Sequence, residues 1–191
     1  MTSPTSLPYT SVKTHPFNDW QIQSIATSQE NSYSVVTACF HTIFQKISSQ
    51  QLHALETLNI EKITYCLRES AITLFFTLTQ ERDQFFDKIR CFVQMATEED
   101  ISILKRQNSP LSNWEIIDYE ENEKKTNEIT LTFKNTEKRN EIFYDLDQLL
   151  TFGMDTLSLI PRSNQILFKF TSPQEKDAFK NEVKQQALMT L

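Results

Sequence analysis

The chain has 191 residues, a net charge of −6 and a single glycine, Gly153, where about 13 glycines would be average. Phosphate-cradling loops, dinucleotide-binding turns and nucleophile elbows depend on glycines at fixed spacing, so these motifs are absent. No run of about 18 apolar residues and no basic-then-apolar N-terminal stretch is present, so neither a membrane span nor a secretory signal peptide is predicted.

The N-terminal part is expected to contain a flexible leader and a helical segment. Residues 1–18 are rich in Ser, Thr and Pro, which is typical of disorder; an extended segment that orders on a partner is the alternative. Within residues 19–59, the alternating stretch Trp20–Ile25 predicts a short strand, and Ser28 is a candidate helix cap. The next apolar residues recur at helical spacing and predict a core or partner-binding helix: Val36, Phe40, Ile43, Phe44 and Ile47. A second short helix is expected around Gln50–Leu58.

Residues 60–191 repeat one pattern three times, in units of about 60–95, 113–150 and 154–190. In each unit two apolar stretches read as a hairpin, and a polar linker leads into a helix whose apolar residues lie four apart. The second strands of the units are Ile72–Phe76, Ile129–Phe133 and Ile166–Phe170. The helices are expected to begin at the caps Thr79, Thr136 and Ser172, and to bury Phe85, Ile142 and Phe179.

The interval between the first two units is longer than the next one. Its stretch Thr97–Lys105 predicts an extra capped helix or turn. The loop Gln107–Ser112 is the best candidate for a subdomain boundary.

The alternation along the strands predicts the fold class. One strand face is apolar and should meet the helices, whereas the other is rich in Thr and should meet water. The prediction is a two-layer α+β domain: an antiparallel sheet with helices on one face, built from three strand–strand–helix units after the N-terminal helical segment.

No residue set predicts catalysis, a cofactor or a metal. Cys39 and His41 are two residues apart, so on a helix they would point in different directions. The three cysteines, Cys39, Cys66 and Cys91, form no CxxC pattern, so a disulfide framework is not predicted. This usage fits a reducing compartment: the cytoplasm, or a host cytoplasm reached by a route with no readable signal.

Five residues are the candidates for partner binding. Arg82, Arg139 and Lys176 recur at one position in the three units, either because a repeat keeps its surface residue or because they present cations to an acidic partner or phosphates. Phe75 and Leu167 interrupt the polar strand face, so they mark either a contact surface or the place where the N-terminal helix packs.

These features favour a non-enzymatic protein-interaction domain, such as an adaptor, a chaperone-like factor or a cytoplasmic-type effector. A protein partner would add a strand to a sheet edge or lie in an apolar groove, and an exposed edge would also permit self-association. One alternative is a phospholipid or nucleic-acid binder that uses the C-terminal third, since residues 124–191 carry a net charge of +1 against −7 for residues 1–123. The other alternative is an enzyme with a dispersed site, with Cys66 or Cys91 near His53 as first suspects.

Overall fold

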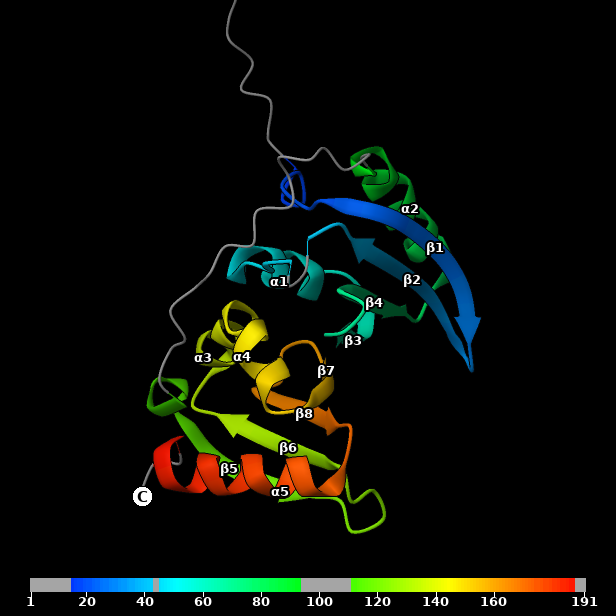
Figure 1. The fold of residues 1–191 in the computed structure, drawn as a ribbon. Coiled ribbons are helices and arrows are strands. Elements are labelled where there is room, and N and C mark those ends of the chain that lie inside the picture. The colour runs from blue at the N-terminus through cyan, green and yellow to red at the C-terminus, as the bar shows by residue number, and fades with distance from the viewer. Residues whose placement is uncertain (1–14, 43–44, 94–110, 188–191) are drawn as a thin grey trace, which may run out of the picture.

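The computed structural model describes residues 15–42, 45–93 and 111–187 (Figure 1). The first half of the chain contains four strands and two α-helices: β1 (Ile22–Glu30), β2 (Tyr33–Phe40), α1 (Ser49–Glu56), β3 (Ile60–Cys66), β4 (Ala71–Phe76) and α2 (Thr79–Ile89). The second half follows the same order with two helices in the middle: β5 (Ile116–Glu121), β6 (Glu128–Phe133), α3 (Thr136–Glu141), α4 (Leu146–Thr151), β7 (Met154–Leu159), β8 (Gln165–Phe170) and α5 (Pro173–Glu182).

The eight strands within the described ranges form one antiparallel sheet in the order β1-β2-β4-β3-β7-β8-β6-β5. The order is symmetric: from either end, it passes through the first, second, fourth and third strand of one half. The two halves meet at β3 and β7, and the edge strands are β1 and β5. The first strand of each half is therefore a sheet edge.

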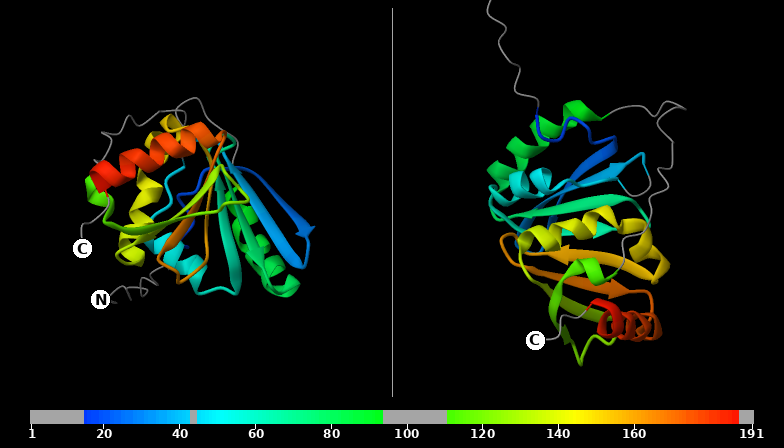
Figure 2. Two further views of the ribbon diagram at one scale, coloured as in Figure 1. Left: turned by 90° about the horizontal axis from the view of Figure 1, so that it is seen from below. Right: turned by 90° about the vertical axis from the view of Figure 1, so that its left-hand side faces the viewer.

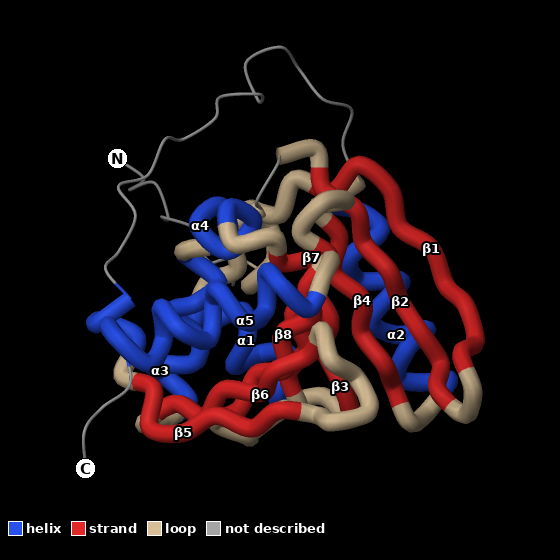
Figure 3. The backbone as a smooth tube through the Cα atoms, turned by 60° about the horizontal axis from the view of Figure 1, so that its bottom comes forward, coloured by secondary structure: helices blue, strands red, loops and turns tan. Residues whose placement is uncertain are grey.

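The helices cover one face of the sheet, as the right-hand view of Figure 2 shows. In Figure 3, α2 lies behind β1, β2 and β4. The core lies between the two layers, where Phe85, Ile142 and Phe179 are all buried. The predicted α+β fold with helices on one face is confirmed, and so is the burial of these three side chains. The equivalence of the three units stays a prediction.

The other face is polar along its middle. One transverse row of paired residues crosses it from strand to strand: Ala26, Thr37, Thr73, Thr64, Ser158, Leu167, Thr130 and Glu120. Two hydroxyl pairs hydrogen-bond within this row, Thr37 with Thr73 at 3.2 Å and Thr64 with Ser158 at 2.8 Å. The hydroxyl groups satisfy one another on the face that carries no helix.

The predicted N-terminal helix is wrong, because residues 33–40 form strand β2. Val36, Ala38 and Phe40 face the helices, and Val35 is buried as well, so apolar residues on both faces hide the two-residue period. Ser28 lies in the middle of β1 and caps no helix. The short helix expected near residue 50 is α1, which Ser48 caps in a capping box with Gln51.

The helix starts agree with the sequence only in part. Ser172 caps α5 by accepting the Glu175 amide at 3.2 Å, as predicted. The cap of α3 is Asn135 in place of Thr136, and Thr79 is already the first residue of α2. Gly153 ends the α4 region with a positive φ of 75°, and a β-carbon there would collide with the Glu175 carboxyl group. This glycine therefore serves the turn of the chain between α4 and β7.

Some predicted segments fall wholly or partly outside the described residues. The extra helix at Thr97–Lys105 lies outside them, as do residues 107–110 of the loop Gln107–Ser112. The leader at residues 1–14 lies outside as well. Among the rest of the leader, Phe17 is buried against Trp20 and Phe85, so residues 15–18 belong to the folded body.

Phe133 tests the helix-facing core. It is fully buried on β6. We expect Phe133→Ala to lower the free energy of unfolding by about 3–5 kcal/mol, because the truncation leaves a cavity among the helices. Chemical denaturation measures this loss. Ile160→Ala is the matched control, since this side chain is 62% exposed and its truncation should change stability by less than about 0.5 kcal/mol. Equal effects of the two changes would contradict the proposed core.

Candidate functional site

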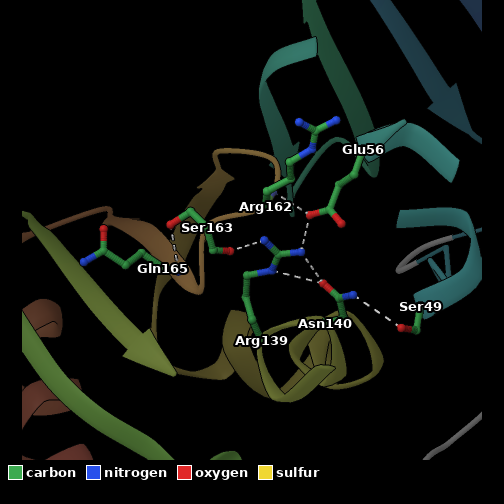
Figure 4. Close-up of polar contacts among 7 residues, drawn as sticks. All are labelled: Ser49, Glu56, Arg139, Asn140, Arg162, Ser163 and Gln165. Carbon is green, nitrogen blue, oxygen red and sulfur yellow. Dashed lines mark hydrogen bonds and ion pairs between the residues drawn. The ribbon is translucent and has the colours of Figure 1, made fainter. Parts of the chain in front are cut away.

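The first candidate site surrounds Arg139, which lies on α3 and is fully buried (Figure 4). Its guanidinium group donates to the Glu56 carboxylate at 2.5 Å and to the Asn140 side-chain oxygen at 2.7 and 3.0 Å. It also donates to the Ser163 carbonyl oxygen. A buried guanidinium needs acceptors for its five N–H groups, and these three residues accept four hydrogen bonds from it.

The partners of Arg139 belong to both halves of the chain. Glu56 ends α1 in the first half, and its carboxylate also accepts the Arg162 amide at 3.0 Å. The side-chain amide group of Asn140 donates in turn to the hydroxyl of Ser49 at the start of α1, at 3.3 Å. The cluster thus joins α1 to α3 and to the turn between β7 and β8. With its cation buried and paired, the cluster has a structural role and offers no free charge to a partner.

Arg82 and Lys176 each tie the last helix of one half to the edge strand of that half. Arg82 donates to the Ser28 carbonyl of β1 at 3.1 Å and pairs with Asp83 at 2.7 Å. Lys176 pairs with Glu121 of β5 at 2.6 Å and with Asp177 at 3.1 Å. The side chains of Arg82 and Lys176 are only 12% and 9% exposed.

The ion pair at β5 is the more strongly charged of the two. Lys180, one turn after Lys176, also contacts Glu121 at 3.0 Å. Hydrogen bonds from the two lysines lower the pKa of the Glu121 carboxyl, and the bond to Glu121 raises the pKa of Lys176. The charges on α5 are therefore largely neutralised by the adjacent strand.

Phe75 and Leu167 lie on the helix-free face but not together. Phe75 on β4 is covered by the Tyr33 ring, which meets it edge-on at 6.2 Å, and by the Lys62 ammonium 4.2 Å from the ring centre. Leu167 on β8 is half-buried between Ser158 and Thr130. Strands β3 and β7 separate the two residues, and the helices of the described residues cover the opposite face of the sheet (Figure 2). The structure does not gather the five predicted residues into one surface.

The cysteines and His53 are not brought together either. Cys66 points to the helix-free face of the sheet beside Ala71, whereas His53 belongs to α1 on the other face. Burial raises the pKa of the Cys66 thiol, which makes it a weaker nucleophile at neutral pH. Cys91 is exposed, and its thiol donates to the Lys88 carbonyl at 3.0 Å. Across the described ranges, no three His, Cys, Asp or Glu side chains gather where a metal could bind.

The second candidate site is the outer edge of β1. The Phe40 amide donates to the Ser70 carbonyl next to β4, and the His41 amide donates to Gln21 before β1. The backbone groups of odd-numbered β2 residues therefore point towards β1. Their partners on β1, Ala26 and Ser28, direct their own amides and carbonyls inwards, towards β2. The amides and carbonyls of Ile25, Thr27 and Gln29 consequently point outwards.

In the part of the chain that the structure describes, the outer side of β1 is open and carries little charge. Among the described residues, no strand pairs with it from Gln23 to Glu30; only Val93 forms an isolated parallel bridge there, to Ile22. In nine residues β1 carries one charged side chain, Glu30 at its end. Edge strands usually carry charges, prolines or bulges that prevent further pairing. The single irregularity here is the register shift between Ile22 and Ser24.

The opposite edge, β5, is closed by two devices. Three of its six residues are acidic: Asp118, Glu120 and Glu121. The Phe133 amide of β6 donates towards β8. Because backbone groups alternate in direction along each strand, the amide and carbonyl of Tyr119 on the paired strand β5 point outwards. That outward Tyr119 amide already donates to the Asp118 carboxylate at 2.8 Å. Of the two sheet edges, as residues 15–42, 45–93 and 111–187 form them, β1 is thus the one that is open to a new strand.

The sequence predicted a binding edge without saying which one. The alternation in Trp20–Ile25 indicated a strand there, but its place at a sheet edge depends on long-range pairing. A useful signal was the low charge of residues 21–29, a stretch without Lys, Arg, Asp or Glu.

Comparison with protein-family models, with curated proteins and with solved structures finds no match. No helix among the described residues is long and apolar enough to cross a membrane. The function therefore has to be inferred from the chemistry of the two candidate sites.

The buried cluster gives a stability prediction. Arg139→Met leaves the Glu56 carboxylate, whose side chain is 10% exposed, without its cation. We expect unfolding to become easier by about 3–5 kcal/mol, as measured by denaturant titration. Arg162→Met is the matched control, because this neighbouring arginine is exposed and contacts Glu56 through its backbone amide. Adding Glu56→Leu to Arg139→Met should restore part of the loss. A neutral effect of Arg139→Met alone would show that the cluster does not hold the halves together.

The Glu121 ion pair gives a pH prediction. A carboxyl group whose pKa is lowered by folding stabilises the native state above its unfolded pKa, here near the ordinary value of 4.5. This contribution is lost as the pH falls through the lower folded-state pKa. The difference in Tm between the natural chain and Glu121→Gln should therefore be largest above about pH 5 and shrink as the pH is lowered further. Glu123→Gln, in the exposed hairpin loop beside it, should show no such difference. A Tm difference that persists unchanged at pH 3 would contradict the assignment.

Proposed function

We propose that this protein is a non-enzymatic protein-interaction module, an adaptor, chaperone-like factor or effector that takes up an extended segment of a protein partner. The segment pairs with the outer edge of β1 and becomes a ninth strand of the sheet. The open backbone groups of Ile25, Thr27 and Gln29 carry this proposal.

The side chains beside the edge set the character of the segment. Ile25 lies on the helix side of the sheet and packs against the core. Its neighbours in the strand, Ser24 and Ala26, lie on the helix-free face. Side chains alternate between the two faces of a strand. A bound segment therefore places an apolar residue next to Ile25 and small or polar residues on the helix-free face.

Strand addition fits the surface better than an apolar groove does. Within the described part of the chain, the large apolar side chains that are exposed are Leu78, Val93, Ile117 and Ile160. Val93 lies at the β1 edge and Ile117 on β5 at the opposite edge, whereas Leu78 follows β4 and Ile160 follows β7. A helix bound in a groove needs a contiguous apolar surface, which these residues do not supply by their positions.

The two alternatives have less support. A phosphate-binding surface in the C-terminal third would draw on its ten Lys and Arg residues. Four of them are paired with carboxylates and offer little free charge: Lys134 and Lys138 with Glu115 at 2.8 and 3.3 Å, and Lys176 and Lys180 with Glu121. A thiol enzyme would need an activated cysteine, and the pKa of Cys66 is shifted in the wrong direction. Three free cysteines support work in a reducing compartment such as the cytoplasm of the producing or of a host cell.

Thr27→Pro tests the edge directly. Thr27 turns its amide outwards, so proline at this position removes no hydrogen bond of the sheet but blocks an added strand. Peptides selected from a random 12-residue display library on the natural chain should bind the Thr27→Pro variant at least about tenfold more weakly, since strand addition relies on backbone bonds.

Thr27→Ala is the matched control, because it shortens the same side chain and keeps the amide. Its affinity for the selected peptides should stay within about twofold of the natural chain. Hydrogen exchange supplies a second readout: bound peptide should slow exchange at Ile25, Thr27 and Gln29. Selected peptides that bind the Thr27→Pro variant as tightly as the natural chain would place the binding site elsewhere.

A further inference from the structure

We propose that the β1 edge also pairs with the β1 edge of a second copy of this chain, antiparallel and around a two-fold axis at Ala26. This inference rests on the use of the same edge as the proposed function, but it commits to a particular occupant and register. The result is a symmetric dimer with one continuous sheet.

The backbone geometry fits an axis at Ala26. Ala26 bonds inwards to β2, so two copies of Ala26 can face each other only as a pair without mutual hydrogen bonds. In that register, Ile25 of one copy lies opposite Thr27 of the other. Both residues turn their amide and carbonyl outwards, as a hydrogen-bonded antiparallel pair requires.

The side chains are self-complementary in the same register. Ser24 lies opposite Ser28, and Gln23 lies opposite Gln29, with the small Ala26 side chains at the centre. Like charges directly opposite each other destabilise a strand pair, and no charged residue lies in this stretch. The chain carries a net charge of −6, so a neutral edge is the place where two copies meet with the least repulsion.

Neighbouring residues fix the limits of the pairing. Val93 bridges the outer side of Ile22, where Glu30 of the second copy would otherwise come, so the pairing ends at Gln23 and Gln29. An axis at Ser24 would pair Ile22 with Ala26, although Val93 already bridges the outer side of Ile22. An axis at Ser28 would leave only residues 26–30 paired and put Glu30 opposite Ala26. Of the axes at Ser24, Ala26 and Ser28, the one at Ala26 gives the longest paired stretch, and no charged residue lies in it.

The edge is also held in place before pairing. Arg82 on α2 donates to the Ser28 carbonyl from the helix side while the outward groups of Thr27 and Gln29 remain open. An edge that is already ordered loses little conformational entropy when a second strand joins it.

Cysteine cross-linking tests the register. In the full chain with Cys39, Cys66 and Cys91 replaced by serine, Ala26→Cys puts two thiols in a pair whose Cα atoms are about 4.5 Å apart, within the range of a disulfide. Under mild oxidation we expect at least about tenfold more disulfide-linked dimer than for Ser28→Cys, whose two copies lie about 13 Å apart along the strands. Mixing the Ser24→Cys and Ser28→Cys chains should restore cross-linking.

A second measurement covers the case in which the cysteine replacements disturb the fold. Sedimentation of the natural chain should show a concentration-dependent dimer that Thr27→Pro removes and Thr27→Ala retains. A natural chain that stays monomeric, or equal cross-linking by Ala26→Cys and Ser28→Cys, would overturn the proposed dimer. If Thr27→Pro loses peptide binding and the natural chain forms no dimer, the proposed function stands and the proposed dimer falls. If the natural chain forms the dimer but binds no peptide, the dimer stands and the proposed function falls.

Discussion

Strands β3 and β7 join the two halves of the sheet through four residue pairs, from Ile63 with Leu159 to Cys66 with Thr156. So short a ladder is supported on both faces of the sheet. The Thr64 and Ser158 hydroxyls bond on one side, and the Tyr65 ring meets Phe143 edge-on on the other. The Arg139 cluster adds a buried ion pair between helices of different halves, where a missing partner is costly. The single eight-stranded sheet, with its two distant edges, depends on this junction.

The sequence predicted much of the fold beyond residue 60, because strict alternation and four-residue spacing are local signals. The helix predicted over residues 33–40 was wrong, because Val35 and Val36 are both buried and a strand that is apolar on both faces has no clear two-residue period. The Arg139 cluster was beyond sequence reasoning: Glu56 lies 83 residues away and Ser163 lies 24 residues away. The open edge was only half predictable, because strand order is decided by pairings such as β2 with β4 that no local pattern encodes.

The recurrence of a cation near each helix start now has a physical account. Such a cation opposes the helix dipole and needs compensation. For Arg82 and Lys176, the next residue is an aspartate that supplies it, and the remaining donors reach the edge strand of the same half. In α3 the neighbour is Asn140 and the distant Glu56 supplies the charge. A shared sequence position thus carries two different tasks, one at the sheet edges and one at the junction.

The Asp118 carboxylate that occupies the Tyr119 amide has a consequence for assembly. If both ends of the sheet accepted strands, β1 of one molecule would add to β5 of the next, and this head-to-tail contact would repeat into an open fibre. Because the Tyr119 amide at one end is occupied by the Asp118 side chain, the proposed strand addition between copies would be confined to matching β1 ends and would close after two molecules. A carboxylate on one strand thereby limits the size of any homotypic assembly that the other end of the sheet forms.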